Sequence, residues 1–165
     1  SEIEGRGTPG HWEADFMLFA RYGQGLLVLH ERQTRFSIVL HPLDRKAVLT
    51  ARTIARQLGK LPQALRKTIS FDNGTEFAEH HRLHNALGVQ TFFCDPHSPW
   101  QKGGVENSIG RLRRSLPRKT DLKAITAAAL KRLAQRLNDT PRKCLDFKTP
   151  AEAFSKLKPI VALQT

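Results

Sequence analysis

The segment Trp12–His41 reads WEADFMLFARYGQGLLVLHERQTRFSIVLH. It holds three apolar or alternating stretches rich in Phe, Val, Ile and Leu, a pattern typical of β-strands. The polar turns between these stretches are short enough for hairpins, so the strands are expected to pair antiparallel. The predicted strands are Trp12–Ala20, Leu26–His30 and Arg35–His41, and the turns are Tyr22–Gly25 and Arg32–Thr34.

After this segment the apolar period becomes helical. Asp44 stands where it can cap a helix, and Gly59 stands where it can stop one. Between them, apolar residues recur every three or four positions, which predicts an amphipathic helix. Its buried face is expected to consist of Ala47, Val48, Ala51, Ile54, Ala55 and Leu58.

Strands and helices then alternate. Thr68–Phe71 is a short predicted strand, a helical stretch runs from about Glu76 to Leu87 until Gly88 closes it, and Val89–Cys94 is another predicted strand. The order βββαβαβ predicts an α/β fold. We expect a mixed five-stranded sheet, with its first three strands antiparallel, flanked by helices.

The C-terminal third is predicted to be helical after a loop. Asp95–Gly104 holds two prolines and two glycines and is interpreted as a mobile loop. Val105–Leu116 is a strongly basic predicted helix, and a short helix is expected near Ala151–Leu157. Between them a stripe at helical spacing is expected to be core rather than a dimer surface: Leu122, Ile125, Ala129, Leu133 and Leu137.

A chain of 165 residues is expected to form one domain. We assign residues 10–158 to this domain and residues 159–165 to a tail. Residues 1–9 are interpreted as a linker or tag-derived segment, because Ile3-Glu4-Gly5-Arg6 resembles a protease recognition site used in expression.

The charge balance favours a polyanionic partner. The chain has 27 Lys and Arg against 15 Asp and Glu, a formal net charge of +12, so nucleic acid is the first candidate and a solvated basic surface the alternative. Cys94 and Cys144 are isolated in the sequence and fit a reducing cytosol. No apolar run approaches the length of a membrane helix, so we expect a soluble cytoplasmic protein.

Three carboxylates are candidates for chemistry. Asp15 lies in the first predicted strand, Asp72 ends the fourth, and Glu106 begins the helix after the loop. If the first and fourth strands are neighbours, the three can meet, and their repulsion would call for a divalent cation. Oxygen ligands alone suit Mg²⁺ or Mn²⁺. An acidic set of this kind is a weak signal by itself.

The residues around these acids make the signal specific. The three blocks are GHWEAD at 10–15, FDNGTEF at 71–77 and SPWQKGGVEN at 98–107. They resemble the catalytic blocks of bacterial transposases of the insertion-sequence-thirty family, and the later runs LNDTPRK at 137–143 and FKTP at 147–150 resemble that family too. The family belongs to the Asp-Asp-Glu recombinases, which include retroviral integrases and share a ribonuclease H-like fold.

The resemblance implies a site and an activity. The family's triad maps onto Asp15, Asp72 and Glu106, with 56 and 33 residues between them and none substituted. It implies DNA cleavage and strand transfer with two Mg²⁺ or Mn²⁺ ions, acting on transposon ends and target DNA. We further expect a homodimer or higher homo-oligomer at the bacterial nucleoid. The family's N-terminal helix-turn-helix region is missing here, so we expect an excised core or a truncated protein.

Other residues have competing interpretations. Glu13, Glu76 and Asp95 lie near the triad in sequence but are not expected to be ligands. His80 and His84, one helical turn apart, are interpreted as a solvated or packed face rather than a zinc site. Trp100 either plugs the core or guides DNA, and the sequence does not separate the two.

Basic residues near Glu106 are candidate DNA contacts. Arg113 lies seven residues after Glu106, on the same helical face, and Gly110 between them leaves room for a phosphate. Arg111 and Arg114 flank this stripe, and Lys102 precedes it; each is a candidate contact. The enzymatic rival is a nuclease on the same fold that hydrolyses but never joins DNA. The non-enzymatic rival is a basic nucleic-acid-binding module.

Overall fold

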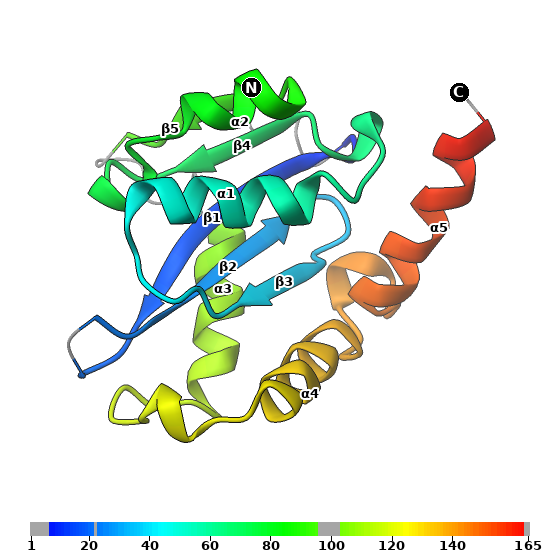
Figure 1. Ribbon diagram of the computed structural model, residues 1–165. Coiled ribbons are helices and arrows are strands. Elements are labelled where there is room, and N and C mark those ends of the chain that lie inside the picture. The colour runs from blue at the N-terminus through cyan, green and yellow to red at the C-terminus, as the bar shows by residue number, and fades with distance from the viewer. Residues whose placement is uncertain (1–6, 22, 96–102, 164–165) are drawn as a thin grey trace.

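The computed structural model describes residues 7–21, 23–95 and 103–163, with the side chains of the last helix described to residue 157. These residues form a five-stranded sheet in the order β3-β2-β1-β4-β5 (Figure 1). β1 pairs antiparallel with β2, which pairs antiparallel with β3; β1 and β5 each pair parallel with β4. The predicted mixed sheet is confirmed. The strands are β1 (His11–Leu18), β2 (Gly25–Glu31), β3 (Ser37–Leu40), β4 (Thr68–Phe71) and β5 (Gln90–Phe93).

Helices cover both faces of the sheet. α1 (Ala47–Leu58) and α2 (His81–Leu87) lie on one face, and α3 (Gly103–Arg113) and α4 (Ala127–Asn138) lie on the other, so that α3 passes behind β1 and β2 in Figure 1. Each face has its own hydrophobic core. Side chains alternate along β1, so this strand contributes to both cores. Trp12, Ala14 and Phe16 pack in the first core, under α1, and Met17 packs in the second core, under α3.

Trp12 anchors the first core. Its side chain is fully buried, and its indole Nε1 donates a hydrogen bond to the carbonyl of Leu65 at 2.8 Å. Phe154 of α5 (Pro150–Leu163) meets Trp12 edge to face and stacks on Phe36 with ring centroids 4.4 Å apart. These contacts fix the first turns of α5 against the sheet, and the rest of α5 projects away from it in Figure 1.

Two predicted helices are divided in the structure. The stretch from Glu76 to Leu87 becomes a 3₁₀ turn, η3 (Thr75–Phe77), followed by α2. The stripe from Leu122 to Leu137 becomes η5 (Leu122–Ala124) and α4, because the Thr126 hydroxyl accepts from the Ala129 amide and starts a new helix. The stripe is nevertheless core, since its members except Ala129 pack in the second cluster. The remaining 3₁₀ turns are η2 (Gln63–Leu65) and η6 (Lys143–Leu145).

Several helix ends also differ from the sequence prediction, including both ends of α3, for which the sequence predicts Val105–Leu116. Asp44 does not cap α1, because Lys46 holds the capping position and the Asp44 carboxylate accepts from the Lys46 amide in the turn before it. The last helix runs to Leu163 instead of ending at Leu157, so it continues through Pro159. In the part of the chain that the structure describes, no helix has the length and apolar character needed to span a bilayer.

Candidate active site

The sheet register brings Asp15 and Asp72 to one place. Parallel strands β1 and β4 pair Glu13 with Ser70, and the same register continued by two residues sets Asp15 beside Asp72. Asp72 directly follows the last residue of β4, where the chain leaves the sheet. Neighbouring strands lie about 5 Å apart, so carboxylates in this relation can share a cation. The sequence condition that the first and fourth strands be neighbours is therefore confirmed.

Both aspartates lie on the side of the sheet that α3 covers. Ala14 and Phe71, which precede them, point into the core on the opposite side, under α1. Side chains alternate along a strand, so Asp15 and Asp72 point toward α3. Glu106 lies in the first turn of α3 and is exposed. The three predicted site residues thus come from β1, the end of β4 and the start of α3, on one side of the sheet.

Backbone amides orient the two aspartates. The Phe16 amide donates to Asp15 Oδ1 at 2.8 Å, and the Gly74 amide donates to Asp72 Oδ1 at 2.9 Å. A Cβ at Gly74 would lie 2.5 Å from Glu76 Oε2 and 2.8 Å from the same Asp72 oxygen, so a larger residue there would displace both carboxylates. Asp72 is therefore both a turn former and a candidate ligand. Oxygen donors held in this way fit Mg²⁺ or Mn²⁺, although no three His, Cys, Asp or Glu residues among those described are close enough to hold a metal.

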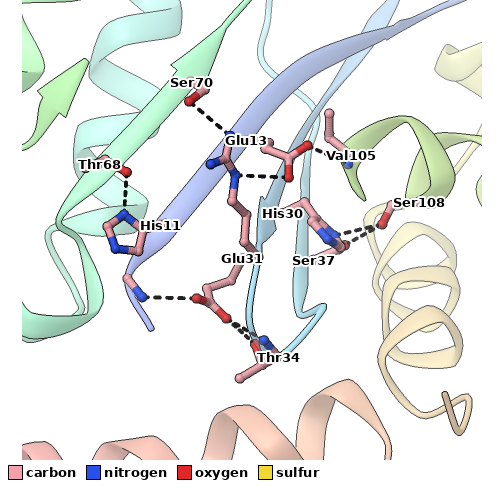
Figure 2. A network of polar contacts seen from close by, with 12 residues as sticks. His11, Glu13, His30, Glu31, Thr34, Ser37, Thr68, Ser70, Val105 and Ser108 are labelled. Atoms are coloured by element: carbon pink, nitrogen blue, oxygen red, sulfur yellow. Dashed lines mark hydrogen bonds and ion pairs between the residues drawn. The ribbon is translucent and has the colours of Figure 1, made fainter. Parts of the chain in front are cut away.

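A buried ion pair joins Arg32 to Glu13, the residue two positions before Asp15 on β1 (Figure 2). Glu13 and Arg32 are 3% and 7% exposed, and Arg32 Nε donates to Glu13 Oε2 at 3.3 Å. Arg32 Nη2 also donates to Ser70 Oγ, while the Val105 amide donates to Glu13 Oε1, each at 3.3 Å. This ion pair joins β1, the end of β2, β4 and the first turn of α3. It therefore fixes the turn that carries Glu106 relative to the strand that carries Asp15.

Burial and the ion pair with Arg32 shift the pKa of Glu13 in opposite directions. Burial is the larger effect and raises the pKa of Glu13, while the positive charge of Arg32 and the Val105 hydrogen bond lower it. The net pKa is raised, so Arg32 only partly offsets the cost of a buried carboxylate. Both Glu13 carboxylate oxygens accept hydrogen bonds, one from Arg32 and one from the Val105 amide. Glu13 therefore has a structural role, and we do not expect it to bind a metal.

A second polar cluster fixes α3 and α4 to the sheet. His30 Nδ1 lies 3.2 Å from Ser37 Oγ and 3.1 Å from Ser108 Oγ of α3, and the two hydroxyls are 2.9 Å apart. The Asn138 side chain at the end of α4 accepts from the Ser37 amide and donates to the Ser37 carbonyl, at 2.9 and 2.8 Å. Asn138 thereby satisfies the backbone of edge strand β3. These buried contacts were not predicted from the sequence. The signal that could have indicated them is the presence of polar residues such as His30 and Ser37 within otherwise apolar strands.

Gly104 is required where α3 crosses the sheet. A Cβ there would lie 2.5 Å from His30 Nε2 and 3.0 Å from Glu13 Oε2. We expect Gly104→Ala to push α3 away from β1 and to destabilise the fold by about 1–3 kcal/mol, as overpacking does. Gly110→Ala on the same helix is the matched control, because a Cβ there has open space and the change should stabilise the helix slightly. Thermal unfolding compares the two, and equal stability would show that α3 is not fixed at Gly104.

The candidate DNA-binding arginines of α3 and the residues after it differ in their contacts. Arg113 donates to the Leu18 carbonyl, and its guanidinium lies 4.8 Å above the Phe19 ring, so it fixes the end of α3 to the end of β1. Arg111 Nε donates to Asn107 Oδ1 at 3.0 Å, and Arg114 is exposed. Lys102, Trp100 and most of the predicted mobile loop Asp95–Gly104 lie outside the described residues.

Two further acidic and basic candidates have contacts of their own. Glu76 forms an ion pair with Arg45, with the Arg45 Nη1 to Glu76 Oε1 distance 3.3 Å. His80 Nδ1 lies 2.7 Å from Thr91 Oγ1, and the His80 ring meets Phe93 edge to face. The Glu76 side chain is therefore paired with Arg45, and the His80 side chain packs against Thr91 and Phe93.

Comparison with known proteins identifies the family. Residues 6–99 match the family model described as the integrase core domain. The chain belongs to this family. The integrase core is 38% identical, over 94% of its length, to a transposase for insertion sequence element IS1086 from Cupriavidus metallidurans, and covers 46% of that protein. It is 36% identical, over 93% of its length, to transposase InsI for insertion sequence element IS30A from Escherichia coli K12, and covers 40% of it. The chain thus spans less than half the length of these relatives.

Solved structures confirm the fold. The catalytic core domain of BIV integrase superposes with a TM-score of 0.68 at 20% identity, covering 92% of this chain and 97% of that one. A simian T-cell lymphotropic virus intasome chain superposes with a TM-score of 0.70 at 18% identity, covering 88% of this chain and 54% of that one. This chain therefore has the predicted ribonuclease H-like α/β fold. The sequence relatives confirm the resemblance to the insertion-sequence-thirty transposases.

Proposed function

We propose that this integrase core is the catalytic domain of a DNA transposase, which cleaves DNA strands and transfers them to a target. The observation that carries the proposal is the register of β1 and β4, which sets Asp15 beside Asp72 on the side of the sheet where α3 presents Glu106. Relatives of this chain are named as transposases, which supports the same activity.

Asp15 and Asp72 are the residues that would hold the first Mg²⁺ or Mn²⁺ ion, and Glu106 would complete a site for two. When bound, such a pair of ions activates the attacking hydroxyl and stabilises the leaving oxygen on the phosphate. The chain's own part is to orient the aspartates through the Phe16 and Gly74 amides and to hold the first turn of α3 through Glu13. Both hydrolysis and strand transfer fit one such site, because each attacking and leaving group is an oxygen on a phosphate.

The partners follow from the charge and the family. The net charge of +12 favours DNA, and the substrates would be transposon ends and target DNA. Two copies of this chain could each act on one transposon end, so we propose a homodimer or higher homo-oligomer. The named relatives are bacterial, so the site of action would be the bacterial cytoplasm at the nucleoid, with residues 10–158 as the catalytic core.

A strand-transfer assay tests this function. The chain is incubated with a labelled precut transposon end, a target plasmid, and Mg²⁺ or Mn²⁺. Joined products that disappear in Asp15→Asn and Asp72→Asn variants are the expected result. Nicked target without joined product would indicate a nuclease on the same fold. Unreacted DNA that both aspartate variants bind as tightly as the parent would instead indicate a DNA-binding module.

A further inference from the structure

A basic cavity lies beside the candidate active site. It encloses about 460 Å³ between the first turns of α3 and the loop around η6. Asn107 and Arg111 line it from α3, Lys143 and Cys144 from η6, and Arg35 from the turn before β3. Asn107 is the residue next to Glu106, so the cavity begins within one helical turn of the candidate metal site.

Positive charges gather in this cavity without a direct ion pair to an acid among the described residues. Arg142, which also lines it, is buried, and its guanidinium donates to the carbonyls of Thr140 and Leu137. Burial is the largest cause that lowers the pKa of Arg142, followed by the charge of Arg111 and, to a smaller extent, that of Arg35, while Cys144 raises it. The cations that line the cavity are thus close enough to act on one another. Among the described residues, no ion pair involves Arg35, Arg111, Arg142 or Lys143. An anion in the cavity would relieve this repulsion.

The backbone conformation of Arg35 is a second observation that bears on this cavity. Arg35 adopts a φ of +64°, a left-handed conformation that glycine would adopt more easily, and its amide donates to the Glu31 carbonyl at 2.9 Å. Left-handed residues other than glycine occur in hairpin turns such as this one, and they also cluster at ligand-binding sites. Here the side chain that an arginine supplies, and a glycine lacks, lines the basic cavity.

We propose that this cavity binds a backbone phosphate of the DNA strand that enters the active site. Arg35, Arg111 and Lys143 would contact the phosphate oxygens, and the contact would set the strand's position one helical turn from Glu106. The proposal rests on the proposed function for the identity of the ligand. It assigns the DNA-positioning role to Arg35 and Lys143, which lie far from Glu106 in sequence, alongside the candidate Arg111.

Cys144 provides a direct probe of occupancy. It is an exposed thiol that lines the cavity, while the chain's other cysteine, Cys94, is buried. With metal omitted, a saturating DNA duplex should slow alkylation of Cys144 by iodoacetamide at least several-fold, and high salt should restore the rate. Unchanged alkylation with DNA bound would overturn the proposal. Equal protection by a poly-glutamate of matched charge would also overturn it, because the cavity would then accept any polyanion.

Matched double variants separate a defined contact from general attraction. Arg35→Gln with Lys143→Gln removes two charges at the cavity, and Arg52→Gln with Arg56→Gln removes two exposed charges from α1 on the opposite face. The cavity pair should reduce the slope of log affinity against log salt by about one unit, as one lost phosphate contact does, and the α1 pair by much less. Equal reductions in the two would contradict the proposal. These binding measurements contain no metal. Their outcome therefore does not depend on whether Asp15, Asp72 and Glu106 are the metal ligands.

Discussion

Replacing Glu106 by Gln should lower metal-dependent DNA nicking on the order of 100-fold or more, while DNA affinity holds or rises. The amide keeps the size and hydrogen-bonding capacity of the carboxyl group but loses the charge that a cation requires. Glu106 is exposed in the first turn of α3, so the change should leave the fold intact. Removal of a negative charge near bound phosphate would favour binding rather than oppose it.

Glu152→Gln is the matched control for this change. Glu152 is likewise an exposed glutamate in the first turn of a helix, α5. The Glu152→Gln variant therefore shows how the loss of one carboxylate at a helix N-terminus changes nicking and DNA binding when that carboxylate binds no metal. Nicking and DNA binding are measured side by side for both variants. Undiminished nicking by Glu106→Gln, or an equal loss in the two variants, would show that the site is misassigned.

The largest stability effect is expected from Arg32→Ala. This change leaves the Glu13 carboxylate buried without its cation, and breaking a buried pair in this way costs about 3–5 kcal/mol. Such a loss is a large part of the 5–15 kcal/mol that typically holds a domain together. Arg21→Ala provides the control, because the Arg21–Asp121 ion pair is solvent-exposed on the arginine side and such surface pairs contribute little to stability. Urea unfolding of the three proteins measures the difference.

The cost of Arg32→Ala should also depend on pH. The pKa of Glu13 is raised in the folded protein, so folding favours its protonated form, and without Arg32 that preference becomes stronger. Stability from such a group is present below the unfolded pKa and is lost as pH rises through the folded pKa. The stability deficit of Arg32→Ala should therefore shrink as pH falls toward 4.5, the ordinary glutamate value. A deficit that grows under these conditions would contradict the account of Glu13.

The elements that the sequence predicts well are those with a local signal. Alternation along Trp12–Ala20 and helical spacing after Asp44 identify the strands and α1, because each pattern depends on neighbours within a few residues. The position of Asp72 at a strand end followed from its turn residues. The Glu13–Arg32–Ser70 contacts have no such signal. They depend on how β1, β2 and β4 align in the sheet, which only the folded chain determines.

Arg113 illustrates the limit of spacing arguments. Its position seven residues after Glu106 places both on one face of an ideal helix. In the folded chain the end of α3 packs against the end of β1, and the Arg113 guanidinium contacts Leu18 and Phe19 there. The predicted DNA role of Arg113 thus competes with a structural one. The cations of the basic cavity, from the turn before β3 and from η6, are separated too widely in sequence for any local pattern to group them.

The most direct test of the acidic site is a crystal structure of this chain soaked in Mn²⁺ and measured at a wavelength where manganese scatters anomalously. We expect an anomalous peak between the Asp15 and Asp72 carboxylates, with oxygen ligands at about 2.1 Å, and Glu106 within reach of the same ion or a second one. A peak at another site, or no peak at saturating Mn²⁺ with the two carboxylates turned apart, would contradict it.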